Sequence, residues 1–509
     1  MVARRSLVVL GAVLGACTGN GSPAGGSTGA ATAETGLDTT GTATEPGTAT
    51  GPGTAGTSTT ASGTTGNACP PDQTSCEGVC VDTQTDPAHC GGCDNPCGDF
   101  ESCQGGTCSP DTTIAEVVLG DKHTCIRTFT GRVRCWGANG QGQLGLGHNE
   151  DIGDDELPSS ASDVDLGGIP ALRLAAGALH TCALLDGGTV RCWGANSNRQ
   201  LGFEGSGNNA PDPNLNVQNV SSAVAIAASA GGIHTCALIE GGTVRCWGWN
   251  TDGQLGYGIS SSGTVAMGDV DVGGTVTAIA AGRRHTCALL DDGDIRCWGA
   301  NDVGQLGHGD NTFDRVGDDE VPAGTPTVAL GEPAVAIAAG SEHTCALLES
   351  GTRVRCWGNS PDGELGYGDI QPVGDDEPPA DAGDVLLSPT PGAESIVRLA
   401  VGSKHTCVTF EDGAAQCWGQ AAYGQLGYGS LDDIGDDEPP AGAGLLMAPS
   451  AATLATGGHH TCMLATAGSV RCWGFAPYGS LGYGDAVGGI YGDMAGEVPD
   501  ALPDVEVFP

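Results

Sequence analysis

The chain has few aromatic residues, few basic residues and, after its first residues, no apolar run long enough to cross a bilayer. Aromatic side chains make up 4% of the 509 residues and glycine provides 88, which argues against long core helices and favours many short strands with tight turns. Lysine and arginine number 19 against 61 aspartates and glutamates, so the formal net charge is -42. A field of that sign repels phosphate backbones and anionic headgroups. Nucleic acid is therefore not expected as a partner, and a membrane only through a lipid anchor.

Cysteine, in contrast, is abundant, with 23 residues. Such numbers are typical of chains that leave the reducing cytosol. The opening sequence MVARRSLVVLGAVLGAC (residues 1–17) has a basic start, a short apolar run and small residues before Cys17, the pattern of a secretory signal. LGAC, residues 14–17, also resembles the lipobox of bacterial lipoproteins, which implies cleavage before Cys17 and its acylation. We expect a lipoprotein at the outer membrane or cell surface of a Gram-negative bacterium; secretion after an ordinary signal peptide is the alternative.

Two segments separate this signal from the main part of the chain. Residues 18–68 are almost entirely Thr, Gly, Ala, Ser and Pro, which predicts a disordered linker. Residues 69–108 hold eight cysteines, which predicts a small disulfide-rich module with any of 105 connectivities. Its stretch CVDTQTDPAHCGGC resembles cysteine-rich modules of bacterial cell-surface proteins. Cys90-Gly-Gly-Cys93 could also be a redox dithiol or half of a zinc site, but an even count of cysteines in an exported chain favours structural bridges.

Residues 111–509 contain one unit repeated seven times. Each unit carries the tripeptide HTC, followed by CWG. The HTC histidines are His123, His180, His234, His285, His343, His405 and His460. Successive units lie 51 to 62 residues apart, and four short strands repeated at this period predict a β-propeller. In the second unit the first three strands are expected within LRLAAGALHT, TCALL and TVRCW, and DVDLG (Asp163–Gly167) is the expected fourth strand of a blade.

The two cysteines of each unit flank a hairpin turn at equal distance, as Cys182 and Cys192 do around Asp186-Gly187-Gly188. Residues placed in this way face each other across the ladder, close enough for a disulfide. The predicted bridges are Cys125 to Cys135, Cys182 to Cys192, Cys236 to Cys246, Cys287 to Cys297, Cys345 to Cys356, Cys407 to Cys417 and Cys462 to Cys472. Together with the module and Cys17, these account for all 23 cysteines.

The succession AAG..HTCAL, G.VRCWG.N..GQLG and DVDVGG resembles the repeat of the regulator of chromosome condensation family, over about 400 residues. That resemblance implies an all-β, seven-bladed β-propeller. Guanine-nucleotide exchange is implied by analogy alone, and export and acidity argue against it. The light-sensing tryptophans of a plant member stand two positions before the repeat histidine, where this chain has Asp121, Ala178, Gly232, Arg283, Ser341, Ser403 and Gly458.

The two residues before each HT form the most variable short window of the unit. In the related propellers they lie on one rim, where partners bind. Both lysines of the chain stand in this window, together with three other cationic side chains. The predicted partner site is Lys122, Arg283, Arg284, Lys404 and His459. Its expected partner is an envelope or extracellular protein or glycan; the alternative is that these exposed positions simply vary without function.

Four acidic loops share the pattern of IGDDELP, residues 152–158. Their carboxylates could bind Ca²⁺. Because the spacing matches no EF-hand or nonapeptide calcium motif, solvated acidic loops are the favoured interpretation. The residues are Asp154, Asp155, Asp318, Asp319, Asp375, Asp376, Asp436 and Asp437. No other metal and no cofactor is expected.

No nucleophile–base pair, phosphate-binding loop or helix-borne metal motif stands out, and the HTC histidines are expected to bond backbone within their own blades. The sequence therefore predicts a non-enzymatic binding protein. A glycan-active propeller enzyme is the alternative, and a purely structural envelope role is the third possibility.

Overall fold

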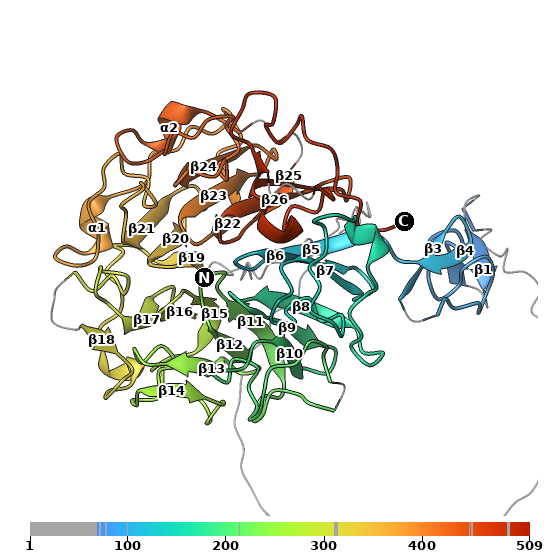
Figure 1. Cartoon of the computed structure of the whole chain (residues 1–509), viewed down its shortest axis with the longest axis horizontal. Coiled ribbons are helices and arrows are strands. Elements are labelled where there is room, and N and C mark those ends of the chain that lie inside the picture. Colours follow the sequence, from blue (N-terminus) through green and yellow to red (C-terminus); the bar gives the residue numbers. More distant parts are fainter. Residues whose placement is uncertain are drawn as a thin grey trace, which may run out of the picture.

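The computed structural model describes residues 69–70, 73–76, 79–98, 100–212, 214–309, 314–446, 448, 451–485 and 489–509. The expected signal, Cys17 and the linker 18–68 lie outside the described residues. The described part forms a small cysteine-rich module and a ring of seven antiparallel sheets (Figure 1). The chain is therefore all-β with a seven-bladed β-propeller, as the sequence predicted.

Each blade begins with an innermost strand next to the ring axis, where successive innermost strands contact one another. Alanine is frequent in these strands, and small side chains allow the strands to approach closely around the axis. They are β5 (Ile114–Leu119), β8 (Ala171–Ala176), β11 (Ala223–Ala228), β15 (Val276–Ala281), β19 (Ala334–Ala339), β22 (Ile396–Val401) and β25 (Ala451–Thr456).

The HTC and CWG segments form the second and third strands of each blade, so the disulfide hairpin lies outside the innermost strand. The second strands are β6 (His123–Thr128), β9 (His180–Leu185), β12 (His234–Ile239), β16 (His285–Leu290), β20 (His343–Leu348), β23 (His405–Phe410) and β26 (His460–Ala465). The third strands are β7 (Val133–Gly137), β10 (Val190–Gly194), β13 (Thr243–Asn250), β17 (Ile295–Ala300), β21 (Val354–Gly358), β24 (Ala415–Gly419) and β27 (Val470–Phe475).

The fourth strand is short and lies outside the expected segment. Three blades have one, as β14 (Ser261–Thr264), β18 (Arg315–Val316) and β28 (Ile490–Tyr491), and the other four have a single bridge at Ile152, Asn208, Val373 or Ile434. The prediction of a strand at Asp163–Gly167 was wrong. That segment leaves the blade toward the next innermost strand, and its buried Val164 donates its amide to the carbonyl of Val133.

Helical structure in the described residues is confined to single turns that begin at proline. These are η1 (Pro158–Ser160), η2 (Pro322–Gly324), α1 (Pro379–Ala382), α2 (Pro440–Ala443) and η3 (Pro477–Gly479). None of these turns has the length or the apolar character to cross a membrane.

All seven hairpin disulfides are present at the predicted pairs. Cys182 lies directly opposite Cys192 in the β9–β10 ladder, with 4.1 Å between their Cα atoms. The same register holds in the other blades, through Cys125–Cys135, Cys236–Cys246, Cys287–Cys297, Cys345–Cys356, Cys407–Cys417 and Cys462–Cys472.

The tryptophan of each CWG is completely buried and joins its blade to the preceding one. Trp193 donates its indole N–H to the carbonyl of Gln143, which belongs to the GQLG loop of the first blade, at 2.9 Å. Thr181 donates its hydroxyl to the same carbonyl, also at 2.9 Å. The GQLG loop of one blade is thus held by two side chains of the next.

The HTC histidines complete these joints, and they do so across blades rather than within them. His123 Nε2 lies 2.9 Å from Thr181 Oγ1 of the next blade. Because that hydroxyl already donates to Gln143, it accepts from the imidazole N–H. Seven such bonds form a closed ring, ending with His460 to Thr124. The expectation of backbone partners within each blade was wrong, because the turn brings each imidazole to the neighbouring blade.

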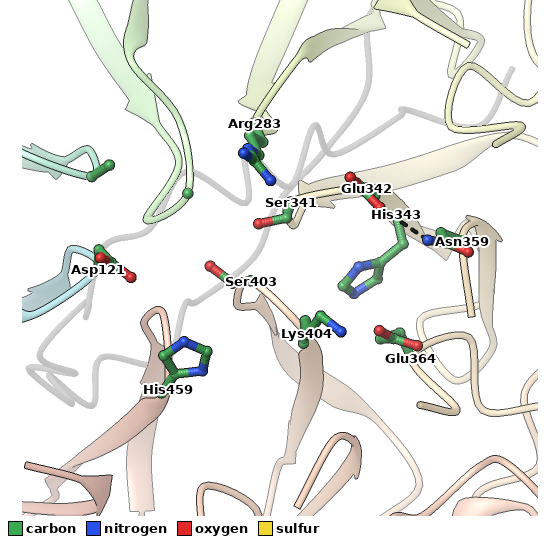
Figure 2. Close-up of a pocket in the computed structure, with 12 residues that line it drawn as sticks. Asp121, Arg283, Ser341, Glu342, His343, Asn359, Glu364, Ser403, Lys404 and His459 are labelled. Carbon is green, nitrogen blue, oxygen red and sulfur yellow. Dashed lines mark hydrogen bonds between the residues drawn. The ribbon is translucent and has the colours of Figure 1, made fainter. Parts of the chain in front are cut away.

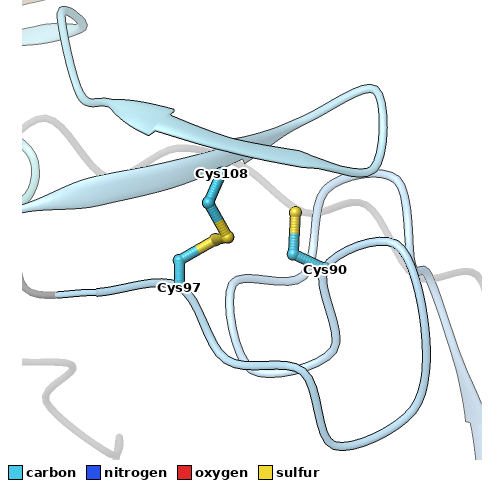
Figure 3. Close-up of side chains that lie close together, drawn as sticks. All are labelled: Cys90, Cys97 and Cys108. Atoms are coloured by element: carbon cyan, nitrogen blue, oxygen red, sulfur yellow. A yellow bond between two sulfur atoms is a disulfide. The ribbon is translucent and has the colours of Figure 1, made fainter.

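The module at residues 69–108 contains two hairpins, β1 (Thr74–Cys76) with β2 (Val79–Val81) and β3 (Glu101–Gln104) with β4 (Thr107–Pro110). Its bridges overlap successively along the chain, as Cys69–Cys80, Cys76–Cys93, Cys90–Cys103 and Cys97–Cys108. The sulfurs of Cys90, Cys97 and Cys108 lie within 4.8 Å of one another (Figure 3). All three are oxidised, so this cluster offers no thiolate to a metal.

Candidate functional site

The seven loops that join first to second strands meet at one end of the ring axis and enclose a pocket of about 340 Å³ (Figure 2). Every blade contributes to its wall. The lining residues are Asp121, Ala178, Gly231, Arg283, Ser341, Glu342, His343, Asn359, Glu364, Ser403, Lys404 and His459. We call this the axial pocket, and the loops around it the rim.

A tight turn places the variable residues at the rim. In the second blade the amide of Gly177 donates to the carbonyl of His180, leaving Ala178 and Leu179 at the tip. A Cβ added to Gly177 would lie 2.1 Å from Cε1 of His180, so only glycine fits before the turn. The buried imidazole therefore fixes the position of the rim residues but does not constrain their side chains.

The third blade has a longer loop, which reaches across the pocket. Two extra residues separate β11 from His234, compared with the fourth blade. A Cβ on Gly231 would lie 2.4 Å from Oγ of Ser341, which belongs to the fifth blade. Backbone bonds tie neighbouring tips together as well, including Arg283 N–H to Ser341 O and Ser341 N–H to Ser403 O, both at 3.2 Å. The rim is thus a connected surface rather than seven separate loops.

Three of the five predicted partner residues line the axial pocket, and two do not. Arg283, Lys404 and His459 belong to its wall. Arg284 instead pairs with Asp252 and Asp302, and its hydrogen bonds with Asp252 raise the pKa of its guanidinium. Lys122 lies 5.7 Å from the ring centre of Tyr478, beside the pocket.

The cations of the pocket differ in how far they are already paired. Lys404 Nζ lies 2.6 Å from Oδ2 of Asp362. Burial lowers the pKa of His459, whose ring lies 4.7 Å from that of Tyr423. Arg283 is exposed and forms no side-chain hydrogen bond or ion pair with the part of the chain that the structure describes. Arg283 is therefore the cation of the wall that is available to a ligand.

The wall also has acidic side chains that the sequence analysis missed. Burial raises the pKa of Glu364 to about 7, and its Oε2 accepts the amide N–H of Asp362 at 2.9 Å. Glu364 occupies the place of the glutamine in GQLG, so the signal in the sequence was PDGELG in the fifth unit. Glu342 lines the same pocket, and its carboxylate accepts from Asn359 Nδ2 at 2.9 Å.

The HTC histidines belong to the joints between blades, and His343 also borders the axial pocket. Each is completely or almost completely buried. Burial lowers the pKa of His180 to about 3, and the effect is similar in the other six. They are neutral at physiological pH, and Nε2 of each is engaged by a threonine of the next blade.

The acidic loops lie away from the axial pocket, at joints between blades. Gly309 of the fourth blade donates its amide to the carbonyl of Gly374, in the GDDE loop of the fifth. In each loop two aspartates and the following glutamate bring carboxylate oxygens within 4.8 Å, a donor set that could hold a hard cation. These glutamates were not among the residues expected from the sequence. Burial and the adjacent aspartates raise the pKa of each to about 7; they are Glu156, Glu320, Glu377 and Glu438.

Comparison with known proteins identifies the repeat. Residues 205–507, more than half of the chain, match the RCC1-like domain, and residues 114–143, 173–200 and 130–184 match the regulator of chromosome condensation (RCC1) repeat. The ultraviolet-B receptor UVR8 of Arabidopsis thaliana is 31% identical over 360 residues, which cover 70% of this chain and 74% of that protein. The chain belongs to the RCC1 repeat family. This confirms the resemblance drawn from the HTC and CWG motifs.

Membership of the RCC1 family establishes the propeller but not an activity. Human E3 ubiquitin-protein ligase HERC2 is 28% identical over 363 residues, which are 70% of this chain but 7% of that ligase. The crystal structure of human WBSCR16 aligns with a TM-score of 0.56 at 22% identity, covering 69% of this chain and 85% of that one. Outside the propeller, residues 54–111 match the Stigma-specific STIG1-like protein family, so the cysteine-rich module is similar to a region of that family.

Proposed function

We propose that the axial pocket and its rim bind a protein or glycan outside the cytosol, without catalysis. The observation that carries this proposal is the convergence of seven different loop tips on one pocket, each tip adjacent to an identical buried histidine. The residues that maintain the fold and the residues that can select a partner are thus distinct, although they lie only a few positions apart in the sequence. Loops positioned by a rigid scaffold are where binding residues concentrate.

The charges of the pocket indicate what its partner presents. Arg283 is the unpaired cation, whereas Asp121, Glu342 and Glu364 place carboxyl groups on the same wall. Serine hydroxyls at Ser341 and Ser403 add donors that rotate. A partner with an acidic group for Arg283 and with hydroxyl or amine donors for the carboxylates fits this wall. Uronic-acid sugars and mixed-charge peptide loops both have this chemistry.

The test immobilises the full chain and measures retention of purified envelope polysaccharide and of solubilised envelope proteins. Arg283→Gln removes the free cation and Ser341→Trp fills the pocket, and we expect each to abolish retention. Arg353→Gln is the matched control, because Arg353 lies in the β20–β21 turn, at the opposite end of the hairpin from the rim. Retention that survives both rim variants contradicts the proposal. Parallel runs with Ca²⁺ and with EDTA test whether the acidic loops take part.

Glycan hydrolysis is a second candidate, favoured by one observation. Glu364 has a pKa of about 7 and lines the pocket together with Glu342, and a carboxyl that retains its proton near neutrality is what a general acid needs. Glu364→Gln restores the residue of the other GQLG loops, so the fold should tolerate it. Release of reducing ends from envelope polysaccharide by the wild-type chain, and not by this variant, would establish the activity. Absence of release by the wild-type chain would remove this candidate.

We also propose that the chain is exported and held at a membrane by acylation of Cys17. Eleven disulfides in the described residues support an oxidising compartment. In a Gram-negative host, the wild-type chain should fractionate with the membrane and incorporate labelled palmitate. Cys17→Ser should abolish both, and membrane fractionation of the unlabelled variant would contradict the anchor.

A further inference from the structure

The third residues of the innermost strands form a second ring around the axis, far from the rim. Each follows a bulge and pairs with the same position of the second strand, as Arg173 does with Leu184 and Arg398 with Thr409. This ring lies four positions before the first residue of each turn, as Arg173 does before Gly177, which places it about 13 Å from the rim at about 3.3 Å per residue. The seven residues are Glu116, Arg173, Ala225, Ala278, Ala336, Arg398 and Thr453.

Charged residues of this ring stand on different sides of the axis. β8 carries Arg173 and β22 carries Arg398, and these strands lie on different sides of the centre (Figure 1). Burial lowers the pKa of Arg398; the charge of Arg173 lowers it further and that of Glu116 opposes this. The three residues occupy the same register position of their strands, and their charges interact although their blades are not all adjacent.

The single carboxylate in this group is already occupied. Glu116 Oε2 lies 3.0 Å from Nε of Arg127 and accepts the amide N–H of Leu174 at 3.1 Å. Three guanidinium groups, those of Arg127, Arg173 and Arg398, thus share one carboxylate. An excess of positive charge is concentrated here in a chain whose net charge is -42.

Arg173 and Arg398 lack the partners that other strand arginines have. Arg355 pairs with Asp384 at 2.8 Å, and the arginines of three other CWG strands pair with aspartates in the same way. Within the described residues, Arg398 makes no side-chain hydrogen bond or ion pair, and Arg173 bonds only the carbonyl of Leu172. Two partly buried guanidinium groups whose nearby carboxylate, Glu116, is already bonded to Arg127 are unfavourable unless an anion joins them.

We propose that a small oxyanion group binds at the ring axis between Arg173 and Arg398, near the middle of the innermost strands. Planar guanidinium groups bind phosphate, sulfate and carboxylate through paired N–H donors. The other positions at this level include Ala225, Ala278 and Ala336, whose side chains are short. This site is separate from the axial pocket and does not depend on the function proposed for the pocket.

The test measures thermal unfolding of the full chain in phosphate, sulfate, citrate and chloride at equal ionic strength, so that screening is constant. A ligand that binds only the folded chain raises the midpoint, and we expect about 2 °C at about tenfold excess over the dissociation constant in at least one oxyanion. The anion that gives the largest shift shows whether the site prefers a tetrahedral oxyanion or a carboxylate. Titration calorimetry with the same anion gives the stoichiometry, expected to be one per chain.

Two variants separate a binding role from a structural one. Arg398→Gln and Arg173→Gln should each lose the oxyanion-dependent shift and weaken the anion at least about tenfold. In chloride their midpoints should equal or exceed that of the wild-type chain, because one of two repelling charges is gone; loss of a structural contact would lower them. Arg398→Lys keeps the charge without the paired donors and should bind with intermediate affinity.

Arg283→Gln at the rim is the matched control and should keep the full shift. Three results would overturn the proposal. The first is a wild-type chain that binds none of the anions at about 10 mM. In the second, the shift persists in both Arg398→Gln and Arg173→Gln. In the third, the shift vanishes in Arg283→Gln. Either result would place the anion elsewhere.

Discussion

The ring of histidine–threonine joints and the rim of the axial pocket are built from neighbouring residues but obey different constraints. At the joints, imidazole, hydroxyl, indole and backbone carbonyl satisfy one another across blades, and the side chains are buried. One and two residues earlier, the rim positions hold Lys, Leu, Ile, Arg, Glu, His, Asp, Ala, Gly and Ser. The joints determine the backbone path so completely that the rim side chains are free to differ, which makes the rim the place for specificity.

Acidification should break the joints, because their histidines are neutral in the folded chain. Burial lowers the pKa of the seven HTC histidines from 6.5 to between about 3 and about 4. The unfolded chain then binds more protons, so stability is full above pH 6.5 and decreases as pH falls toward 3. Each histidine contributes a slope of about 1.4 kcal/mol per pH unit in this range.

Denaturant midpoints measured between pH 8 and pH 5 under oxidising conditions test this effect, with fluorescence of the buried tryptophans as the signal. A steep loss of stability below pH 6.5 is expected. A midpoint that does not change over this range would contradict neutral, buried imidazoles.

Removal of one hairpin disulfide is the next largest perturbation of the scaffold. Cys287→Ala with Cys297→Ala opens a loop of about eleven residues and should lower the free energy of unfolding by roughly 2 to 3 kcal/mol. Binding by the rim should persist, because the bridge lies in the hairpin and not at the loop tips. Loss of binding in a variant that still folds would show that the rim requires this disulfide.

A single joint can be broken without touching the rim. The hydroxyl of Thr286 lies 2.9 Å from His234 Nε2 and donates to the carbonyl of Gln254 at 2.8 Å. Thr286→Val should cost about 1 to 3 kcal/mol, because it leaves buried polar groups unpaired. Thr286→Ser is the matched control and should recover most of the loss in chemical denaturation. Equal stability of the two variants would argue against the hydroxyl bridge.

The converse change affects the rim and spares the scaffold. Arg283→Gln should alter the free energy of unfolding by less than about 0.5 kcal/mol, since Arg283 is exposed and forms no ion pair within the described residues. If the proposed function is correct, the same variant lowers partner affinity at least about tenfold. A large loss of stability would mean that the rim belongs to the scaffold after all.

Sequence alone predicted the parts of this molecule that depend on local spacing. The hairpin disulfides follow from cysteines equidistant from a turn, and the blade number follows from the recurrence of HTC. The partner of each imidazole was not predictable in this way, because His234 and Thr286 meet across blades and 52 positions apart. DVDLG alternates like a strand, whereas the true fourth strand at Ile152 is a single bridge without a pattern.

The candidate site was predicted only in part for the same reason. The window before HT located the rim and three of its cations. Arg284 pairs with Asp252 and Asp302 instead, and these aspartates lie in loops outside that window. Glu364 belongs to the wall through the GELG loop of the fifth blade, a segment in which the sequence pattern indicated no site residue.

The acidic loops offer the smallest test, with a pH dependence opposite to that of the joints. The pKa of Glu377 is raised from 4.5 to about 7, chiefly by burial and then by Asp376, so the folded chain binds more protons than the unfolded one between these values. This stability is full below pH 4.5 and is lost as pH rises through 7. Glu377→Gln should therefore stabilise the chain by about 0.5 kcal/mol at pH 8, and by less at pH 5.5. The exposed Glu349 of the same blade supplies the control, since Glu349→Gln should change neither value; a gain from Glu377→Gln that is equal at both pH values would show that charge repulsion is not its cause.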